Sequence, residues 1–430
     1  MIKLNENYVV FQICGNRDSP FHAMTNYCLR LCSQLRTIGV NSWVLSDLDC
    51  SAADPSLAEV IAPRVDWATI NENDLQRIIN TASVYRGLVP IIHLHLSYPN
   101  HGCIVRPEFL AHYPNVISVH EHSSKPRHMQ MAQLDYFKAA CKIITSSEIE
   151  LDIISQLSDQ FNEKVHISLG GREFKLHFST PPTIIPSNDV RRNPFARDIA
   201  WLGMIRNGYD WETLFEIAKK LSQNYPGIFL HIIGTSVDPM KLIELLEGLY
   251  VVDLSSYRKD LERLGKNYNF YSTCLLELRS IAEFLTEHGK KKYANIILHL
   301  DKANKEISSI LLEHCFLGLQ HNNDVNIDHS SSISSLMAHG LPVMVRDSCF
   351  FKYYNSHDDL LKDALVIIPS KYPKDFILCV IYWVGVLAME NCLLKVKRNK
   401  TREYIATRNG FQLARGCKLV YETVIKRIET

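Results

Sequence analysis

The stretch YVVFQICGNRDSPFHAMTNYCLRLCSQLRTIGVNSWVL, Tyr8 to Leu45, indicates the class of fold. It opens with a continuous apolar run, turns at Gly15, and then places apolar residues three and four positions apart. That spacing predicts an amphipathic helix, which Gly39 ends before a second apolar run begins at Asn41. Strand, glycine turn, helix and strand in this order are typical of the start of a parallel, Rossmann-like sheet.

The alternation of short apolar runs and amphipathic stretches continues to about residue 170. It predicts helices at Glu72 to Val84, around Gln130 to Ala140 and from Glu148, and strands at 91–96, 116–120, 142–145 and 164–169. The segment STPPTIIPSNDVRRNP, Ser179 to Pro194, is rich in proline and polar residues, as interdomain linkers are. We therefore predict a first domain over residues 1–185.

A second cycle of the same kind follows the linker. Strands are predicted at 199–203, 228–234, 296–300 and 316–320, and Asp210 is placed to cap the helix after the first of them. The stretch 235–293 is rich in Leu, Glu, Lys and Arg at helical spacing, which predicts a helical insertion. These elements predict a second domain over residues 186–406.

The composition limits the classes of function. The chain has 430 residues, of which 46% are hydrophobic and 22% charged, so it is long enough for two folded domains and disorder is excluded as an explanation. Its net charge is +1, whereas proteins that wrap nucleic acid are usually more basic, so we expect no nucleic-acid partner.

The cysteines and the apolar runs indicate the compartment. The twelve cysteines form no CxxC pair, which favours free thiols in a reducing cytoplasm. The N-terminus has no signal-peptide pattern, and the longest apolar stretch, Phe376 to Met389, is too short to span a membrane and is expected to be a buried helix. The basic run 395–402 is expected to be a solvated helix end; peripheral contact with the inner face of an anionic membrane is the alternative.

A serine-rich helix start is the most informative motif. In DHSSSISSLMAHGLPVMV, Asp328 to Val345, three serines precede an apolar-faced helix that Gly340 and Pro342 close. Backbone N–H groups and the positive end of the helix dipole can hold a phosphate at such a position. Serines at helix starts also act as ordinary caps, and both readings stay open.

A glycine turn, WLGMIRNGYDW, follows the first predicted strand of the second domain. Gly203 and Gly208 allow a tight turn, and the guanidinium of Arg206 between them is suited to pair with a diphosphate. A solvated surface arginine is the alternative.

Histidines gather near the ends of two predicted strands of the first domain. His93 and His95 lie in IIHLHL, and His120 lies in VISVHEH. Parallel sheets bind ligands at the carboxyl ends of their strands, which makes His120 a candidate. His93 and His95 alternate with apolar residues and are expected in the core or in a cleft wall. No histidine cluster has cysteines at metal-ligand spacing, and Asp47-Leu48-Asp49 is poorly placed for a metal, so no metal site is expected.

Taken in order, VISVHEH, the linker, the G-x-x-R-x-G turn, a strand ending in IIG and the serine-rich helix start resemble the GT-B glycosyltransferases, in particular the retaining nucleotide-sugar enzymes of glycosyltransferase family four. The resemblance covers nearly the whole chain, and its best local matches are SLMAHGLPVMV and WLGMIRNGYDW. It implies an α/β fold of GT-B type, with two Rossmann-like domains facing across a cleft. A final helix, about 407–430, would return to the first domain.

The same resemblance implies the activity. It implies metal-independent transfer of a sugar, with retention, from a nucleoside-diphosphate sugar to a hydroxyl acceptor such as a glycan or a lipid-linked glycan. No cofactor beyond that donor substrate is implied. The principal catalytic demand is to stabilise negative charge on the departing diphosphate.

The resemblance also assigns residues by position. Gly15 and Asn16 correspond to the glycine turn beside the donor phosphate or the acceptor, and His120 to the histidine that contacts the transferred sugar or its phosphate. Arg206 corresponds to the residue that neutralises the diphosphate. The other donor-binding positions are Gly203, Asn207, Gly234, Ser330, Ser331, Ser332 and Ser335; of these, Asn207 stands in a region where the family often has a lysine.

One departure from the family concerns two glutamates, which are replaced here by Ile327 and Ser335. Asp328 or Asp324 is the candidate carboxylate for the sugar hydroxyls, and Ser335 is the candidate partner of the ribose. The departure also fits a catalytically silent GT-B binding module. A GT-B enzyme of different outcome, an epimerase or an inverting transferase, is a further alternative.

Overall fold

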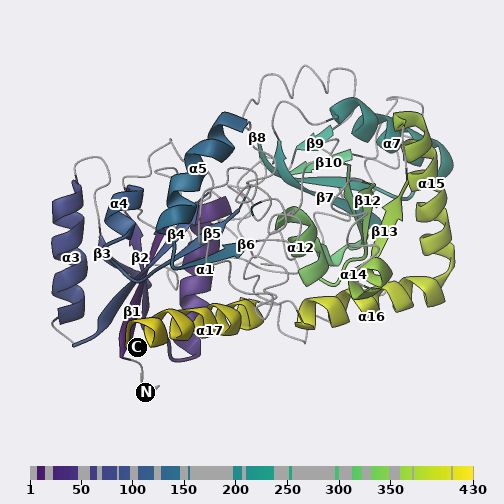
Figure 1. Ribbon diagram of the computed structural model, residues 1–430. Helices are drawn as coiled ribbons and strands as arrows, with labels where there is room; N and C mark the ends of the chain where they lie inside the picture. Colours follow the sequence, from purple (N-terminus) through teal and green to yellow (C-terminus); the bar gives the residue numbers. More distant parts are fainter. Residues whose placement is uncertain are drawn as a thin grey trace, which may run out of the picture. The chain divides into compact units, whose positions relative to one another are not determined.

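The computed structural model contains two parallel sheets with helices packed on them (Figure 1). It describes residues 7–14, 23–46, 59–64, 70–84, 87–96, 105–120, 127–145, 154, 197–205, 210–236, 251–253, 296–299, 312–321, 331–347, 359–369, 372–407 and 410–429. The predicted linker 179–194, the strand 164–169 and all but one residue of the helix from Glu148 lie outside these ranges.

The first sheet has the strand order of a doubly wound Rossmann domain. Its parallel strands lie in the order β3-β2-β1-β4-β5-β6. Their bounds are β1 (Tyr8–Cys14), β2 (Ser42–Ser46), β3 (Ile61–Arg64), β4 (Val89–Leu96), β5 (Asn115–Val119) and β6 (Lys142–Thr145). The order reverses between β1 and β4, and ligands of such sheets bind beyond the carboxyl ends of the strands at this point.

The two faces of this sheet are covered by different helices. Val9, Phe11 and Ile13 of β1 point into one core cluster, whereas Tyr8 and Val10 point into the other. Helices α3 (Glu72–Val84), α4 (Pro107–Leu110) and α5 (Arg127–Ala139) cover the first of these faces, and α1 (Ala23–Thr37) and α17 (Gly410–Glu429) cover the second. Both faces are therefore buried, which explains why the strands are continuous apolar runs.

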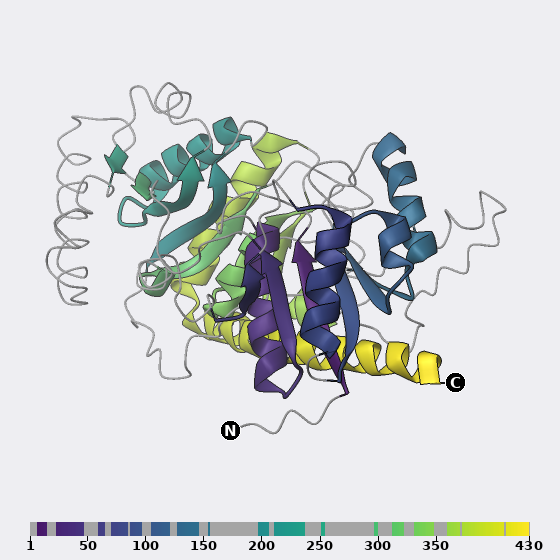
Figure 2. The same cartoon turned by 90° about the vertical axis from the view of Figure 1, so that its left-hand side faces the viewer.

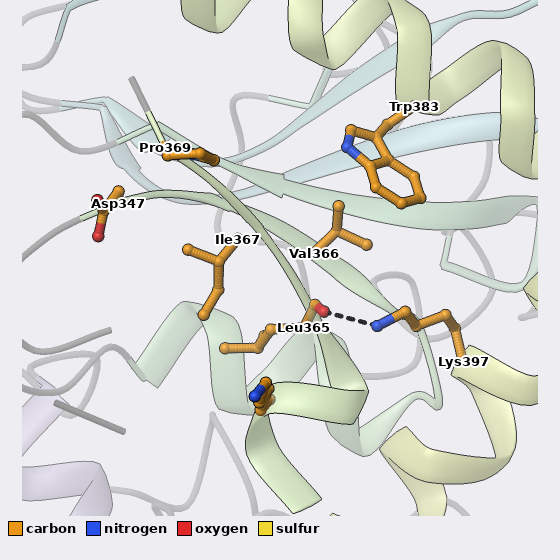
Figure 3. Close-up of a pocket in the computed structure, with 8 residues that line it drawn as sticks. Asp347, Leu365, Val366, Ile367, Pro369, Trp383 and Lys397 are labelled. Atoms are coloured by element: carbon orange, nitrogen blue, oxygen red, sulfur yellow. Dashed lines mark hydrogen bonds between the residues drawn. The ribbon is translucent and has the colours of Figure 1, made fainter. Parts of the chain in front are cut away.

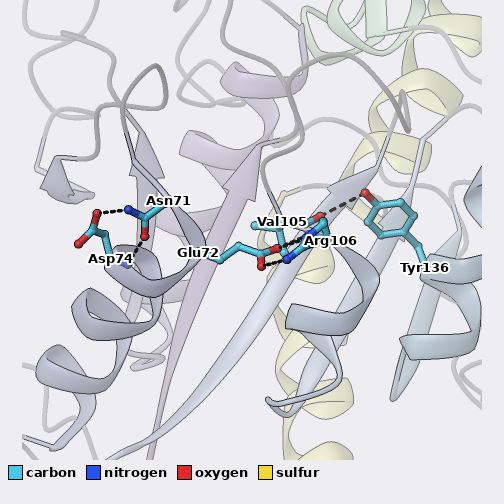
Figure 4. Close-up of polar contacts among 6 residues, drawn as sticks. All are labelled: Asn71, Glu72, Asp74, Val105, Arg106 and Tyr136. Atoms are coloured by element: carbon cyan, nitrogen blue, oxygen red, sulfur yellow. Dashed lines mark hydrogen bonds and ion pairs between the residues drawn. The ribbon is translucent and has the colours of Figure 1, made fainter.

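Polar contacts fix the helices on the first of these faces (Figure 4). Asn71 caps α3, because its Oδ1 accepts the backbone N–H of Asp74 at 3.0 Å. Glu72 pairs with the guanidinium of Arg106, the residue before α4, at 2.8 Å through Nε. The hydroxyl of Tyr136 on α5 donates to the backbone carbonyl of Val105 at 3.2 Å. The last two contacts tie α3 and α5 to the segment that begins α4.

The second sheet is also parallel, with the order β13-β12-β11-β7-β8-β10-β9. Its strands are β7 (Asp198–Ile205), β8 (Leu230–Ser236), β9 (Val251–Asp253), β10 (Ile296–His299), β11 (Cys315–Gln320), β12 (Val343–Arg346) and β13 (Leu365–Ile368). The predicted helical insertion 235–293 also contains a strand, β9, where two adjacent β-branched valines extend the edge of the sheet beside β10. The rest of that insertion, apart from the end of β8, lies outside the described residues.

The helices of the second sheet include two with predicted termini. Asp210 caps α7 (Trp211–Asn224) as expected, with its Oδ1 accepting the backbone N–H of Thr213 at 3.1 Å. Helix α12 (Ser331–Ala338) begins within the predicted serines, and Gly340 ends it with a φ of 66°. The other helices are α14 (Asp359–Ala364), α15 (Pro373–Met389) and α16 (Asn391–Thr407).

The apolar stretch 376–389 forms α15, but the prediction that it is a buried helix is only half right. Phe376, Val380 and Val384 pack in the core, whereas Leu378 is 63% exposed and Tyr382 66% exposed. The helix is apolar on both sides although it packs on one. The run of apolar letters alone therefore overstated its burial.

Each sheet belongs to its own compact unit. The unit with the first sheet also contains α17, and Figure 2 shows this yellow C-terminal helix beside the purple α1. The other unit contains the second sheet with α15 and α16. Within the described ranges, no single helix has the length and hydropathy of a membrane span, and α15 with the residues from Asn391 to Lys426 meets that test only as a sharply bent pair.

Candidate functional site

Two glycines lie side by side near the carboxyl ends of the central strands of the second sheet. Gly203 of β7 and Gly234 of β8 are direct partners in the register of these strands. The side chain of Gln320, the last residue of β11, donates to the carbonyl of Leu202 at 2.6 Å. This edge is the switch point of the second sheet, because β8 and β11 lie on opposite sides of β7.

The start of α12 approaches the same edge. A Cβ added to Gly203 would lie 3.6 Å from the hydroxyl oxygen of Ser332 and 3.0 Å from the indole of Trp201. Gly203 and Ser332, which are 129 positions apart in the sequence, are thus neighbours. Two motifs that were identified independently, the glycine turn and the serine-rich helix start, meet at one place in the fold.

Arg346 and His321 add polar groups that the sequence analysis missed. Arg346 ends β12, and its guanidinium lies 3.9 Å from the carboxylate of Asp210 and is largely buried. His321 follows β11, and its Nε2 donates to the backbone carbonyl of Asp210 at 2.8 Å. Burial lowers the pKa of His321 to about 4, so its imidazole is neutral at neutral pH. A histidine and an arginine directly at the ends of apolar strands were signals that could have identified both.

In the first domain, His93, His95 and His120 form one cluster. His95 Nδ1 lies 3.1 Å from His120 Nε2, and the rings of His93 and His95 stack with their centroids 4.2 Å apart. Tyr27 of α1 holds the ring of His120 edge-on, at 4.8 Å between centroids. The expectation of a core position is confirmed for His93 and His95, which are completely buried, while His120 at the end of β5 is half-buried.

Burial keeps the two inner imidazoles neutral. It lowers the pKa of His93 to about 3, and it lowers the pKa of His95 well below its usual value. Desolvation of the charged form is the main cause in both, and charge on His120 acts in the same direction. Neither ring therefore takes up a proton near neutral pH.

Half of the predicted site residues can be located. His120, Gly203, Gly234, Ser331, Ser332 and Ser335 lie in the described part of the chain, with the three serines on α12. The others lie outside it: Gly15, Asn16, Arg206, Asn207, Asp328 and Ser330. The structure thus brings Gly203, Gly234 and Ser332 together, and it gives His120 a buried histidine partner.

A cavity of about 340 Å³ lies elsewhere in the second unit, beside the edge strand β13 (Figure 3). Leu365, Val366 and Ile367 line it with Trp383 of α15 and Lys397 of α16. Lys397 Nζ donates to the carbonyl of Leu365 at 3.0 Å, so its ammonium is used within the protein. Of the predicted site residues that the structure describes, none lines this cavity. Within the described ranges, no group of three or more His, Cys, Asp or Glu side chains is arranged to hold a metal ion.

Comparisons with known proteins identify the fold. No protein-family model and no curated sequence matches the chain. Among solved structures, an alpha-glucosyltransferase in complex with UDP matches with a TM-score of 0.61 and 11% identity, over 97% of this chain and 99% of that one. An alpha-glucosyltransferase in complex with UDP and a 13-mer DNA containing a HMU base matches with a TM-score of 0.59 and 12% identity, over 96% and 99%.

A glycosyltransferase from Rickettsia africae ESF-5 is similar as well, with a TM-score of 0.57, 11% identity and coverage of 98% of this chain and 99% of that one. At identities this low the similarity shows a shared fold alone, and it extends over nearly the full length of all these chains. The expected fold class, α/β of GT-B type with two Rossmann-like domains, is confirmed.

Proposed function

We propose that this chain is a glycosyltransferase that moves a sugar from a nucleoside-diphosphate sugar to a hydroxyl acceptor. The observation that carries the proposal is the meeting of Gly203, Gly234 and the first turn of α12 at the switch point of the second sheet. Glycines let a ligand approach the backbone closely, and a helix start offers N–H donors to phosphate. The fold shared with a UDP-bound alpha-glucosyltransferase supports a UDP-sugar as the first donor to test.

The chemistry follows from the leaving group. The sugar departs through an oxocarbenium-like state, and the reaction is easier the better the charge on the departing diphosphate is stabilised. We assign this role to the backbone amides of α12 and to Arg206, without a metal ion. We assign His120 to the transferred sugar or its phosphate, and Asp328 to the sugar hydroxyls. Transfer with retention is part of the proposal.

A carbohydrate, free or lipid-linked, is the acceptor that we propose. One relative in fold was solved with DNA containing a HMU base, so such DNA belongs in the acceptor panel. The balanced charge of this chain does not favour it. We propose a cytoplasmic protein, because the described cysteines are all free thiols. Contact of the basic run on α16 with a membrane is a secondary proposal.

The decisive experiment measures donor binding and turnover. Thermal shift with UDP-, GDP-, dTDP- and CMP-sugars identifies the nucleotide, and chromatography detects sugar released by slow hydrolysis. With a donor in hand, acceptors are tested in turn, and the anomeric configuration of the product separates retaining from inverting transfer or epimerisation.

Matched arginine variants separate an enzyme from a silent binding module. Arg206→Ala should abolish transfer, whereas Arg77→Ala, which removes an exposed arginine of α3, should leave it unchanged. A folded wild-type protein that binds a nucleotide without ever turning over its sugar would instead be a silent module. Absence of binding to every nucleotide sugar would refute the proposal.

A further inference from the structure

The histidine cluster of the first domain belongs to a longer chain of buried hydrogen bonds. From His95 it continues to Gln12 of β1, where His95 Nε2 lies 2.6 Å from Oε1. The amide nitrogen of Gln12 lies 3.2 Å from the hydroxyl of Tyr421 on α17, and that hydroxyl lies 2.6 Å from His93 Nδ1. His93 Nε2 ends the chain 2.7 Å from the hydroxyl of Ser118.

The Gln12 side chain determines which atoms donate and which accept along this series of hydrogen bonds. Among the described residues, its amide nitrogen faces two hydroxyls, those of Ser42 at 3.3 Å and of Tyr421, and its oxygen faces His95. In this orientation the nitrogen donates both of its hydrogens. With the amide turned over, one of its hydrogens would point to His95 and the other would be buried with no acceptor among the described residues, which is unfavourable because a buried N–H group loses its hydrogen bond to water. Gln12 is completely buried, so water cannot relieve that loss.

The assignment of donors and acceptors extends to His120. Because Gln12 Oε1 can only accept, His95 Nε2 carries the proton. His95 is neutral, so its Nδ1 must be an acceptor, and the hydrogen in the 3.1 Å contact belongs to His120 Nε2. In neutral His120 the Nδ1 atom is therefore the acceptor of the ring. On the other side of Gln12 the same logic lets Tyr421 donate to His93 and His93 donate to Ser118.

We propose that Gln12, His95 and Tyr421 are positioning residues that hold His120 in the tautomer protonated at Nε2, so that Nδ1 accepts a hydrogen bond from a hydroxyl of the transferred sugar. The contact with the sugar rests on the proposed glycosyl transfer, whereas the tautomer of His120 does not. The assignment also refines the role of His120. A neutral ring of this tautomer selects a hydroxyl at Nδ1, whereas a phosphate oxygen there would require the imidazolium.

Nuclear magnetic resonance tests the tautomer without any activity. Long-range ¹H–¹⁵N correlation spectra of the full chain labelled with ¹⁵N-histidine distinguish protonated from unprotonated ring nitrogens, and His120→Gln assigns the signals of His120. We expect a protonated Nε2 in the wild type. A neutral His120 protonated at Nδ1 overturns the proposal.

Two variants test the positioning role. His95→Leu removes the acceptor of His120, whereas His95→Asn can offer its Oδ1 in place of Nδ1. Tyr421→Phe removes one of the two hydroxyls that orient Gln12, far from His120 in the sequence. We expect mixed tautomers in His95→Leu and Tyr421→Phe and the wild-type tautomer in His95→Asn.

Activity provides the second readout. The kcat of transfer should fall about tenfold in His95→Leu, with little change in donor KM, if the hydrogen bond of the sugar hydroxyl to His120 is stronger in the transition state than in the bound donor. His95→Asn should recover most of it. Full kcat in folded His95→Leu and Tyr421→Phe overturns the positioning role. If the wild type transfers no sugar, the proposed function fails, while the spectra still decide the tautomer.

Discussion

The buried histidines of β4 should make the first domain sensitive to acid. The pKa of His93 is lowered from its ordinary value of 6.5 to about 3. Between these values the unfolded chain takes up a proton at His93 that the native state does not hold. The stability of the native state is therefore unaffected by this group above pH 6.5 and decreases as the pH falls below it. At pH 5, which is 1.5 units below 6.5, the loss is about 2 kcal/mol. His95 acts with the same sign.

His93→Gln removes this titration and should flatten the pH dependence. The variant loses stability at every pH because it disturbs buried hydrogen bonds, so the informative quantity is the slope. Hydrogen exchange of the β4 amides, corrected for the intrinsic rate at each pH, measures the free energy of opening. Between pH 8 and pH 5, protection in the wild type should fall roughly 30-fold more than in the variant.

His112→Gln is the matched control, because His112 is exposed. Its slope should follow that of the wild type. Parallel curves for wild type and His93→Gln would show that His93 is protonated in the native sheet, and the assignment of two neutral inner imidazoles would then be wrong.

Three further variants test packing and charge. Gly203→Ala places a Cβ 3.0 Å from the Trp201 indole and should weaken UDP binding about tenfold by calorimetry, about 1.4 kcal/mol; unchanged affinity would remove this glycine from the donor site. Gly385→Ala overlaps the Tyr225 hydroxyl and should lower the free energy of unfolding by roughly 1–3 kcal/mol in urea, and adding Tyr225→Phe should restore part of it. Glu72→Gln should cost less than about 1 kcal/mol at pH 7, because its arginine partner is 69% exposed. The hydrogen bond from Arg106 lowers the pKa of Glu72 from 4.5, so this difference should decline as the pH falls through that lowered pKa; a difference that does not decline in acid would contradict the ion-pair account.

The sequence predicted most of the helices and strands, because the residues that begin and end each of them are neighbours in the sequence. The bounds of α3 and β6 agree with the prediction, and each is set by neighbouring residues, as at the Asn71 cap. Strand β3 was missed because Pro63 interrupts its short run, a residue that an edge strand tolerates. Strand β9 was missed because two valines were read as part of a leucine-rich helix.

The site was less predictable because its contacts are not local. Alternation placed His95 in the core, but nothing in the sequence indicates that its partners are Gln12 and His120. The serines of α12 had two readings of similar weight, and the sequence does not indicate that Ser332 lies beside Gly203. Such pairings arise from strand order and register, which no periodicity within one segment specifies.

The position of α17 has a consequence for synthesis. Tyr421 and the apolar residues around it complete a core whose strands β1 and β2 are synthesised long before α17. About 400 residues separate Gln12 from Tyr421, which corresponds to roughly 20–80 seconds of translation at 5–20 residues per second. During that interval one face of the first sheet lacks one of its two covering helices, and Gln12 lacks one of its two hydroxyl acceptors. Until α17 emerges, the nascent chain therefore exposes apolar surface that the native state buries, and premature termination before α17 would leave that surface open to aggregation.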